Sequence, residues 1–485
     1  MLTRQSPADT GSRSPRLERS TTALFVLLAT LVSCAHRQAA GPAAAPAEIP
    51  GAYTLYGETA PAPDRWWEGF GSAELSALVE EAMQGSLTLR QSLARLEQSR
   101  ALAVQAGADR LPDLRLTAGA SQTTRKTDDG TVRDRSRSLS LVSSYEVDFW
   151  GRVRARHLSA LQEFEASRED LNTAALTLAS EVTLKWLELL SVRQQLTLLD
   201  EQLATNRTIL DLMELRYLKG AANALDIYQQ RQAVAETEAA FPQLEARLRT
   251  VQNELAALLG KPPGTDLGLS QSEFPEVGAL PETGVPADLL SRRPDVRASG
   301  LELMAARGQV AAARADRLPA VNLTGTAGYS SDRWSDLLDS WLLSLAANLT
   351  APLFDAGSRK AEVARREAML DERLASYGQT VLGAIGEVED ALVRETKQVQ
   401  YIEALREQLR ISRDGYREAL SRYRKGLSDY LPVLSALTGT QRLERSIVQA
   451  RLERLSQRVE LHRALGGGWM DEKLRDRITE RSEGG

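Results

Sequence analysis

The side chains that could do chemistry in this sequence are one thiol, three imidazoles and a few neighbouring acidic pairs. The histidines, which no metal-ligand spacing joins, are His36, His157 and His462. The acidic pairs, such as Glu80 with Glu81 and Glu387 with Asp390, fall in segments of helical periodicity, where a solvated helix face is their expected role. The sequence contains neither a nucleophile elbow nor a phosphate-binding glycine loop. It therefore predicts a protein that is not an enzyme and that uses no metal ion or dissociable cofactor.

Cys34, the single cysteine, ends an N-terminal segment with the features of a secretory signal. Arginines precede a short apolar run from Ala23 to Val32, and the small residue Ser33 comes directly before the cysteine. The stretch Leu31-Val32-Ser33-Cys34 resembles the bacterial lipobox, in which the thiol receives a diacylglycerol and the cysteine becomes the N-acylated first residue. The alternative is an incidental cysteine at the end of an ordinary signal peptide. The lipobox is favoured because the only thiol of the chain stands at this position.

Acylation of Cys34 would tie the protein to a membrane. We predict a lipoprotein signal peptide at residues 1–33 and an acylated, Ala/Pro-rich tether at residues 34–63. Several acyl chains anchor a protein firmly, whereas one chain binds reversibly. The cysteine is followed by Ala35 and His36, not by the aspartate that commonly retains lipoproteins in the inner membrane. The outer membrane is therefore the expected location.

The rest of the chain is an internal duplication. Three landmarks recur 206 or 207 residues further on. They are Arg216-Tyr217-Leu218-Lys219-Gly220 with Arg422-Tyr423-Arg424-Lys425-Gly426, Asp109-Arg110-Leu111-Pro112 with Asp316-Arg317-Leu318-Pro319, and Leu258-Leu259-Gly260 with Ala464-Leu465-Gly466. A helix that ends at glycine, with cations in its last turn, is expected at each Lys-Gly pair. We predict repeats at 64–270 and 287–469, joined by a linker at 271–286 and followed by a charged tail at 470–485.

Each repeat contains two segments in which apolar and polar residues alternate, which is typical of strands. The expected strands are at about 112–124, 138–150, 319–331 and 340–354. The polar segment from Arg125 to Arg137 is expected to connect the first two, with a turn at Asp128-Asp129-Gly130. These lengths suit strands that cross a membrane at a tilt. The pattern alone also allows an ordinary half-buried soluble sheet.

Long helices are expected between the strands. A helix is predicted from Ala73 to Asp109, and a rod from Arg152 to Tyr217 would be roughly 100 Å long at 1.5 Å per residue. A return helix is expected to end at Leu259. The second repeat should contain the same pair, from about Ser358 to Arg424 and back through Leu465. The apolar residues of the first rod follow a near-heptad seam, which predicts coiled-coil packing. They are Leu171, Ala175, Leu178, Val182, Trp186, Leu189, Leu196, Leu199 and Leu203.

The expected strands require an assembly. Four strands are too few to close a barrel, and open strand edges in lipid leave unpaired backbone groups at a cost of several kcal/mol each. The chain must therefore share strands with copies of itself, although the number of copies does not follow from the sequence. A net charge of −5 in 485 residues, with both signs interspersed, argues against a nucleic-acid partner.

Six motifs in order resemble those of the TolC superfamily, and most closely its lipidated outer-membrane channels of resistance-nodulation-division (RND) efflux pumps, often called the NodT family, which are OprM-like. The motifs are Trp66-Trp67 with Phe70, Leu75 and Leu78; Asp109-Arg110-Leu111-Pro112; Asp148-Phe149-Trp150-Gly151-Arg152; Ser291-Arg292-Arg293-Pro294-Asp295-Val296; Pro352-Leu353-Phe354-Asp355-Ala356-Gly357; and Ala464-Leu465-Gly466-Gly467-Gly468-Trp469. The resemblance implies an α+β membrane protein that forms a homotrimer. Its 12-stranded β-barrel in the outer membrane would continue into a 12-helix coiled-coil tunnel in the periplasm. It also implies a periplasmic adaptor and an inner-membrane RND transporter as partners, with outer-membrane lipid around the barrel.

The resemblance places the Lys-Gly turns at the periplasmic tips, where the adaptor docks and the tunnel closes. The implied gate and adaptor residues are Arg216, Tyr217, Gly220, Asp226, Arg422, Tyr423 and Gly426. Ion pairs of Arg216 or Arg422 with Asp226 are expected to hold the tip, each contributing about 0.2–1 kcal/mol if exposed. The alternative is that both arginines lie on solvated helix ends. The second repeat departs from the family pattern: its residues six and nine after Gly426 are Pro432 and Ser435, which puts an acidic cation-binding ring in doubt, with Asp429 as a substitute.

The function that this resemblance implies is a passive duct that exports drugs or other small toxic molecules from the periplasm to the exterior. An alternative is the outer-membrane duct of a type I protein secretion system. From a different class, the alternatives are a structural coiled-coil lipoprotein and a periplasmic adaptor. An adaptor should show a lipoyl-like half-motif and a β-barrel domain between its helices, and neither is visible in the sequence.

Overall fold

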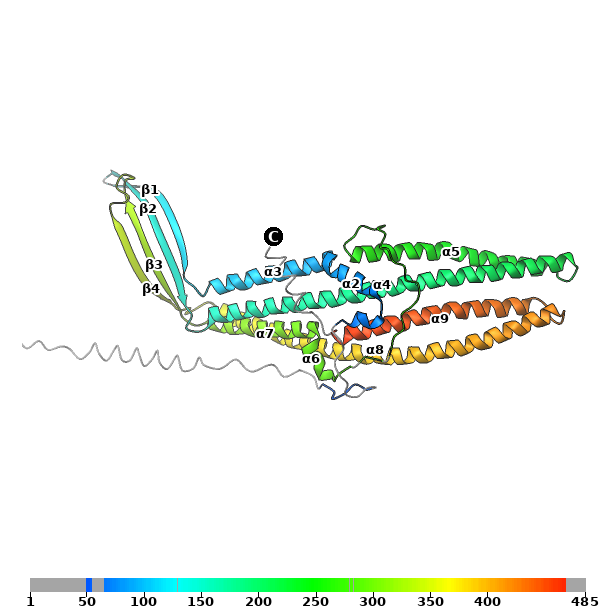
Figure 1. Cartoon of the computed structure of the whole chain (residues 1–485). Coiled ribbons are helices and arrows are strands. Elements are labelled where there is room, and N and C mark those ends of the chain that lie inside the picture. The colour runs from blue at the N-terminus through cyan, green and yellow to red at the C-terminus, as the bar shows by residue number, and fades with distance from the viewer. Residues whose placement is uncertain (1–48, 55–64, 129, 279, 282, 468–485) are drawn as a thin grey trace, which may run out of the picture.

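The computed structural model describes residues 49–54, 65–128, 130–278, 280–281 and 283–467. The predicted signal peptide, Cys34, most of the tether and the charged tail lie outside these residues. The described chain is elongated, with one sheet at one end and a bundle of long helices running away from it (Figure 1). Among the described residues, none of the helices combines the length and apolar character that crossing a bilayer requires.

The two repeats share one order of elements, as the duplication predicts. The first consists of η1 (Trp66–Phe70), α2 (Ala73–Gly85), α3 (Leu87–Ala108), β1 (Asp113–Thr127), β2 (Gly130–Val147), α4 (Arg152–Leu218) and α5 (Ala224–Leu258). The second consists of η2 (Pro286–Asp288), α6 (Leu289–Arg292), α7 (Pro294–Ala315), β3 (Ala320–Ser331), β4 (Trp341–Thr350), α8 (Ser358–Arg424) and α9 (Leu431–Ala464). The long helices α4 and α8 each have 67 residues, so the units match in length as well as in order.

The four strands form one antiparallel sheet in the order β1-β2-β3-β4. Residues paired across adjacent strands point to the same face of a sheet. One face carries rows of apolar side chains, such as the row Leu116, Leu141, Ala327 and Leu343. The other face is largely polar; on it, the hydroxyl oxygens of Thr117 and Ser140 are 2.7 Å apart. The apolar and polar residues that alternate in the sequence therefore lie on opposite faces of the sheet.

The first hairpin is longer than the sequence pattern suggested. The segment that was expected to be a connection continues the ladder, with Arg125 opposite Val132 and Lys126 opposite Thr131. Polar side chains do not prevent backbone pairing. A strand that is exposed to water on both faces therefore lacks hydrophobic alternation, and the pattern underestimates its length. At the other end β2 stops at Val147, because the Asp148 carboxylate accepts hydrogen bonds from the backbone N–H groups of Val153 (3.0 Å) and Arg154 (2.8 Å) at the start of α4.

The single helix expected from Ala73 to Asp109 is two helices, α2 and α3, that meet at Gly85-Ser86. Close backbone contact explains the break. A Cβ on Gly85 would lie 2.3 Å from the Leu259 carbonyl oxygen, and one on Gly260 would lie 2.2 Å from the Gly85 carbonyl oxygen. Gly260 also has a φ of +74°, which glycine adopts without strain. The apolar period runs through this break, so only the tertiary contact reveals it.

The main apolar core forms where α2 packs on α4. All nine seam residues of α4 are buried or half-buried, which agrees with the predicted seam. Trp186 is fully buried, and its indole N–H donates to the Glu74 carboxylate at 2.9 Å. Trp66 and Trp67 from η1 belong to the same cluster, so the N-terminal aromatic motif is part of the core.

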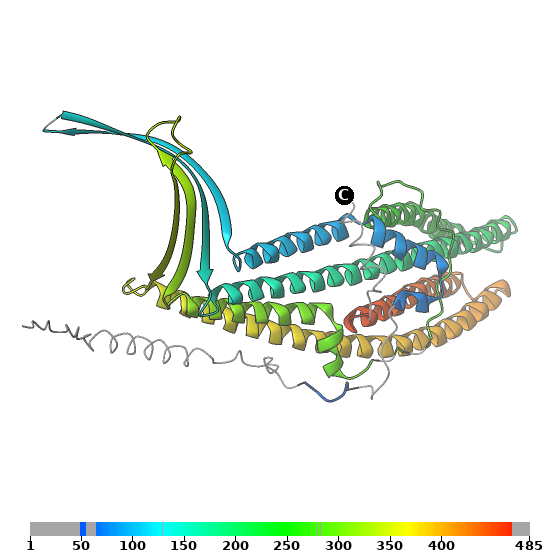
Figure 2. The ribbon, with the colours of Figure 1, turned by 60° about the vertical axis from the view of Figure 1, so that its left-hand side comes forward.

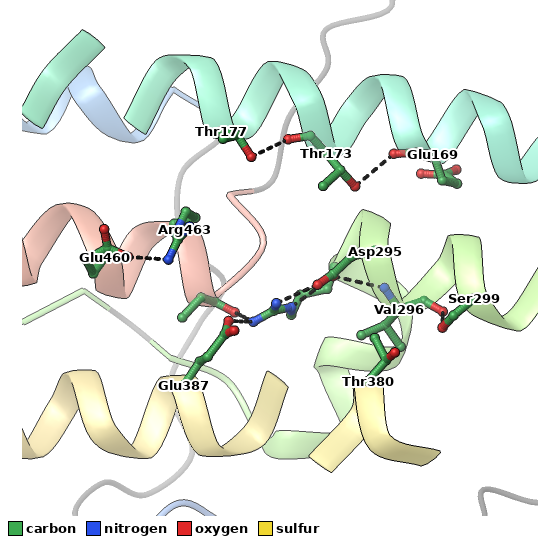
Figure 3. Close-up of polar contacts among 12 residues, drawn as sticks. Glu169, Thr173, Thr177, Asp295, Val296, Ser299, Thr380, Glu387, Glu460 and Arg463 are labelled. Carbon is green, nitrogen blue, oxygen red and sulfur yellow. Dashed lines mark hydrogen bonds and ion pairs between the residues drawn. The ribbon is translucent and has the colours of Figure 1, made fainter. Parts of the chain in front are cut away.

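Arg293 of the Arg-Arg-Pro-Asp motif joins three helices through a buried guanidinium. Its Nη1 donates to Glu387 of α8 at 2.7 Å and to the Ala464 carbonyl at the end of α9 at 3.0 Å, and its Nε donates to Asp295 of α7 at 3.0 Å. Figure 3 shows Asp295 and Glu387 converging on this contact. Glu387 was expected to be a solvated helix-face residue. It is half exposed, but it also fixes α8 against α7, since a buried cation requires such partners.

His462 of α9 is buried against Trp66, with the two rings stacked 5.3 Å apart at 17°. Burial, together with the positive charge of Arg458, lowers the pKa of the imidazole from 6.5 to about 4. The folded protein therefore disfavours the imidazolium.

We predict that this histidine makes the fold acid-sensitive. Between pH 6.5 and about 4 the unfolded chain binds a proton that the folded chain does not, so the free energy of unfolding falls as the pH falls through this window, by up to about 3 kcal/mol. His462→Gln should flatten this dependence in thermal unfolding followed by circular dichroism, with pH 8 as the reference for the side-chain change itself. Equal losses in the variant and the parent protein would contradict the prediction.

Candidate functional site

The two Lys-Gly turns lie side by side at the end of the bundle farthest from the sheet (Figure 1; Figure 2). We call this region the turn end and define it as residues 206–237 and 416–441. A direct contact joins the two hairpins there: the guanidinium of Arg216 lies 4.7 Å from the centre of the Tyr423 ring, and its Nη1 reaches the Arg424 carbonyl at 3.5 Å. The sequence predicted both turns as tips, and the structure brings them together.

Both long helices end in the same hydrogen-bonded motif. The Arg216 carbonyl accepts from the Ala221 N–H at 2.8 Å, and the Arg422 carbonyl accepts from the Leu427 N–H at 2.9 Å. The glycine inside each motif has a left-handed φ, +69° at Gly220 and +72° at Gly426. This is the Schellman ending, which needs glycine because a Cβ disfavours positive φ. The repeated Lys-Gly sequence therefore encodes one repeated backbone geometry.

The return helices begin differently. In the first repeat, Asn223 and Asp226 form a capping box: the Asn223 side chain accepts from the Asp226 N–H at 2.9 Å, and the Asp226 carboxylate accepts from the Asn223 N–H at 3.3 Å. In the second repeat no side chain caps α9, and Pro432 occupies its first turn, where a missing N–H costs nothing. The departure of the second repeat from the family pattern is thus a change in the way the helix starts.

The ion pairs predicted between Asp226 and Arg216 or Arg422 are wrong. In the described part of the chain, Asp226 makes no ion pair, because its carboxylate serves as the helix cap. Arg422 pairs instead with Glu418 of its own helix at 2.9 Å, with both side chains mostly in solvent. The alternative of a solvated helix end therefore holds for Arg422 but not for Arg216. Asp429 is exposed and has no ion-pair partner among the described residues.

The two tyrosines that precede the turns are not equivalent. Tyr217 is 48% exposed, whereas Tyr423 is 4% exposed. Tyr423 packs against Tyr430 with ring centres 5.5 Å apart, and its hydroxyl donates to the Met213 sulfur at 3.2 Å. Burial raises the pKa of Tyr423, and the negative charge of Asp226 adds to this effect. Burial also raises the pKa of Tyr430, so both phenols are neutral in the physiological range.

A buried polar network behind the tyrosines was not found from the sequence. Asn206 of α4 is fully buried; it donates to Thr237 of α5 at 2.8 Å and accepts from Gln441 of α9 at 3.0 Å. The side-chain amide of Gln230 in α5 donates to the backbone carbonyl of Asn206 at 2.6 Å, and its Oε1 accepts from the Tyr430 hydroxyl. The sequence signal for this network is Asn206 itself, a polar residue inside an apolar seam. In coiled coils such an asparagine often fixes the register of the helices.

Exposed apolar side chains surround the turns. Leu218 and Leu427, which flank the two Lys-Gly pairs, are 82% and 72% exposed, and Tyr228 is also exposed. The sequence signal that could have indicated this exposed group is the presence of apolar residues next to each turn and outside the helix seam. Such an apolar group at the end of a bundle is suited to contact with another protein or another copy of the chain.

In the stretches that the structure describes, His, Cys, Asp and Glu form no group of three or more that could hold a metal. What the geometry offers is a point at which the two helical hairpins meet through the Arg216–Tyr423 cation–π contact and the hydrogen bonds of Tyr423 to Met213 and of Tyr430 to Gln230.

Comparisons with known proteins agree with the duplicated architecture. The family model described as outer membrane efflux protein matches residues 78–261 and again residues 285–467. The chain is 34% identical over 424 residues to the pyoverdine export outer membrane protein OpmQ of Pseudomonas aeruginosa, covering 84% of this chain and 88% of that protein. It is 31% identical over 410 residues to the toluene efflux pump outer membrane protein TtgF of Pseudomonas putida, covering 83% and 85%. The solved structure of the outer-membrane channel OprN superposes with a TM-score of 0.84 at 29% identity, covering 89% of this chain and 99% of that one.

Proposed function

The chain belongs to the outer membrane efflux protein family, and from this membership we propose that it is the outer-membrane duct of a tripartite RND-type efflux system. The duct passively exports drugs or other small toxic molecules from the periplasm to the exterior. The observation that carries this proposal is the shared shape: a membrane-type sheet at one end and paired helical hairpins at the other, matched over nearly the whole length of a solved outer-membrane channel.

A homotrimer is the proposed assembly, in which the sheet requires further copies of the chain and the family resemblance sets their number at three. In the described chain β1 and β4 each pair on one side only, and all ten residues of β4 are exposed. Four strands cannot close on themselves, whereas three copies supply twelve, and closure satisfies every strand edge in lipid. The same threefold arrangement places the long helices α4, α5, α8 and α9 side by side as a periplasmic tunnel.

The turn end then faces the other members of the pump. A periplasmic adaptor and an inner-membrane proton-driven transporter are the proposed partners, and the exposed Leu218 and Leu427 offer an apolar docking surface for the adaptor. Small-molecule cargo is supported by the relatives, whose names specify pyoverdine and toluene.

This function can be tested in a deletion strain. Loss of the gene should lower the minimal inhibitory concentrations of several small toxic compounds, and the intact gene on a plasmid should restore them. Secretion of proteins should be unchanged, because the duct serves a small-molecule pump. Unchanged susceptibility together with the loss of one secreted protein would favour the type I secretion alternative instead.

Lipidation of Cys34 is a separate prediction. We expect the thiol to carry a diacylglycerol and the new N-terminus an acyl chain, so cells fed radiolabelled palmitate should label the protein. Cys34→Ser should abolish the label while the strands still insert. Persistence of the label in this variant would place the acyl chain elsewhere.

Arg216 is the proposed latch of the closed tip, because its guanidinium reaches across the turn from the first hairpin to the Tyr423 ring and the Arg424 carbonyl of the second. A cation–π contact contributes about 0.5–1 kcal/mol, so Arg216→Ala should favour the open state about two- to fivefold per subunit. Single-channel recordings in planar bilayers should show a higher mean conductance. Arg422→Ala is the matched control from the other repeat: among the described residues its guanidinium pairs with Glu418 of the same helix and not with the first hairpin, so conductance should stay at the parent value. Equal effects of the two variants would remove Arg216 from the gate.

A further inference from the structure

The β1–β2 hairpin extends beyond the other two strands. At the end of the sheet far from the helices, the outermost residue of β2 that has a β3 partner is Arg137, which lies opposite Ser331. Beyond this pair, residues 121–128 and 130–136 form a two-stranded ribbon that projects past the end of β3 and β4 (Figure 2). We call this segment the outer ribbon. It lies at the end of the sheet opposite the helices, so it points to the exterior in the proposed channel.

The register collects the cations of the outer ribbon on one face. Arg135 lies opposite Gln122, Arg133 opposite Thr124, and Lys126 opposite Thr131. Because paired residues share a face and successive residues alternate, Lys126, Arg133 and Arg135 all project to the same side. A hydrogen bond from Arg135 Nε to the Gln122 side chain at 3.1 Å agrees with this placement.

Among the described residues of the hairpin, no carboxylate lies on this cationic face. Asp134 and Arg125 project to the opposite side of the ribbon, and Asp128 lies in the turn. Within the described residues, none of the three cations forms an ion pair, and all three are exposed. By contrast, at the end of β1 nearer the helices, Arg115 forms an ion pair with Asp113 at 2.5 Å.

The cationic face continues the apolar face of the sheet. Moving outward along this face, the row of Leu116 and Leu141 is followed by a row that includes Tyr329 and Trp341, and then by Arg137. The guanidinium of Arg137 lies 5.2 Å from the ring centre of Trp334. Apolar, aromatic and then cationic side chains follow the order of hydrocarbon, interface and headgroups across one leaflet.

We propose that the cationic face of the outer ribbon binds the phosphate groups of anionic lipids in the outer leaflet around the channel. This proposal depends on the proposed placement of the sheet in the outer membrane. Guanidinium groups form paired, charge-assisted hydrogen bonds with phosphate, and Arg133 and Arg135 stand about 7 Å apart along the strand, so they can engage separate phosphates. The position of the cations directly beyond the aromatic row favours a lipid over a soluble anion.

Binding of purified, full-length protein to lipid A in mild detergent tests this proposal. Native mass spectrometry would compare lipid A that carries two phosphates with lipid A from which both have been removed. Each cation near an anionic lipid surface contributes about a fivefold gain in affinity, so Arg135→Gln should weaken binding of the phosphorylated form about fivefold. The combined substitution Lys126→Gln, Arg133→Gln and Arg135→Gln should weaken it about a hundredfold. All variants should bind the phosphate-free form equally.

Arg125→Gln is the matched control, since it removes the same charge from the opposite face of the same ribbon and should leave affinity unchanged. Equal losses for Arg125→Gln and Arg135→Gln would overturn the proposal, as would parent-like binding by the triple variant. Displacement of the lipid by an equal concentration of inorganic phosphate would also overturn it, because the site would then be one for a free anion. Planar-bilayer conductance of the same preparations separates the lipid-binding proposal from the channel proposal. A triple variant that conducts supports the channel function, whether or not it binds lipid A.

Discussion

The four strands of one chain leave two strand edges, at β1 and at β4, and the rest of the molecule follows from how these edges are satisfied. In water an open edge is solvated, but in hydrocarbon each unpaired N–H and C=O costs several kcal/mol. Closure with strands of identical neighbours is the available solution. It fixes the copies around one axis, so the helices that leave the sheet must run on together as a tube.

The duplication explains why one chain supplies two nearly identical hairpins, and the structure shows where the copies diverged. Both long helices end in the same Schellman motif at Gly220 and Gly426. Past these glycines the first copy uses a capping box and the second uses Pro432 and a buried Tyr430. The backbone turn is therefore common to both repeats, whereas the contacts that link the hairpins come from unlike residues, with Arg216 of one repeat over Tyr423 of the other.

Long helices with an apolar seam can slide past one another by a turn at little cost, and buried polar contacts prevent this. Asn206 bonds to α5 and α9, Arg293 to α7, α8 and the end of α9, and Arg458 of α9 to Glu395 of α8 at 2.9 Å. Each of these contacts forms in one register only, since a displaced partner would leave a buried polar group unsatisfied. The bundle thus has its alignment fixed near the turns, near the middle and near the junction with α7.

The sequence alone determined the duplication, the four strands, the long helices and the turns, because each depends on local periodicity or on glycine at a helix end. Tertiary structure decided what depends on neighbours distant in the chain. The break at Gly85 follows from contact with Gly260, and Asp226 caps a helix where a charge pair was expected. The apolar period could not show the outer ribbon, because pairing there is made by backbone groups while the side chains stay polar. Nor could it distinguish Tyr217 from Tyr423, since both stand three residues before a Lys-Gly turn glycine and only tertiary contacts with Tyr430, Arg216 and Met213 bury the second.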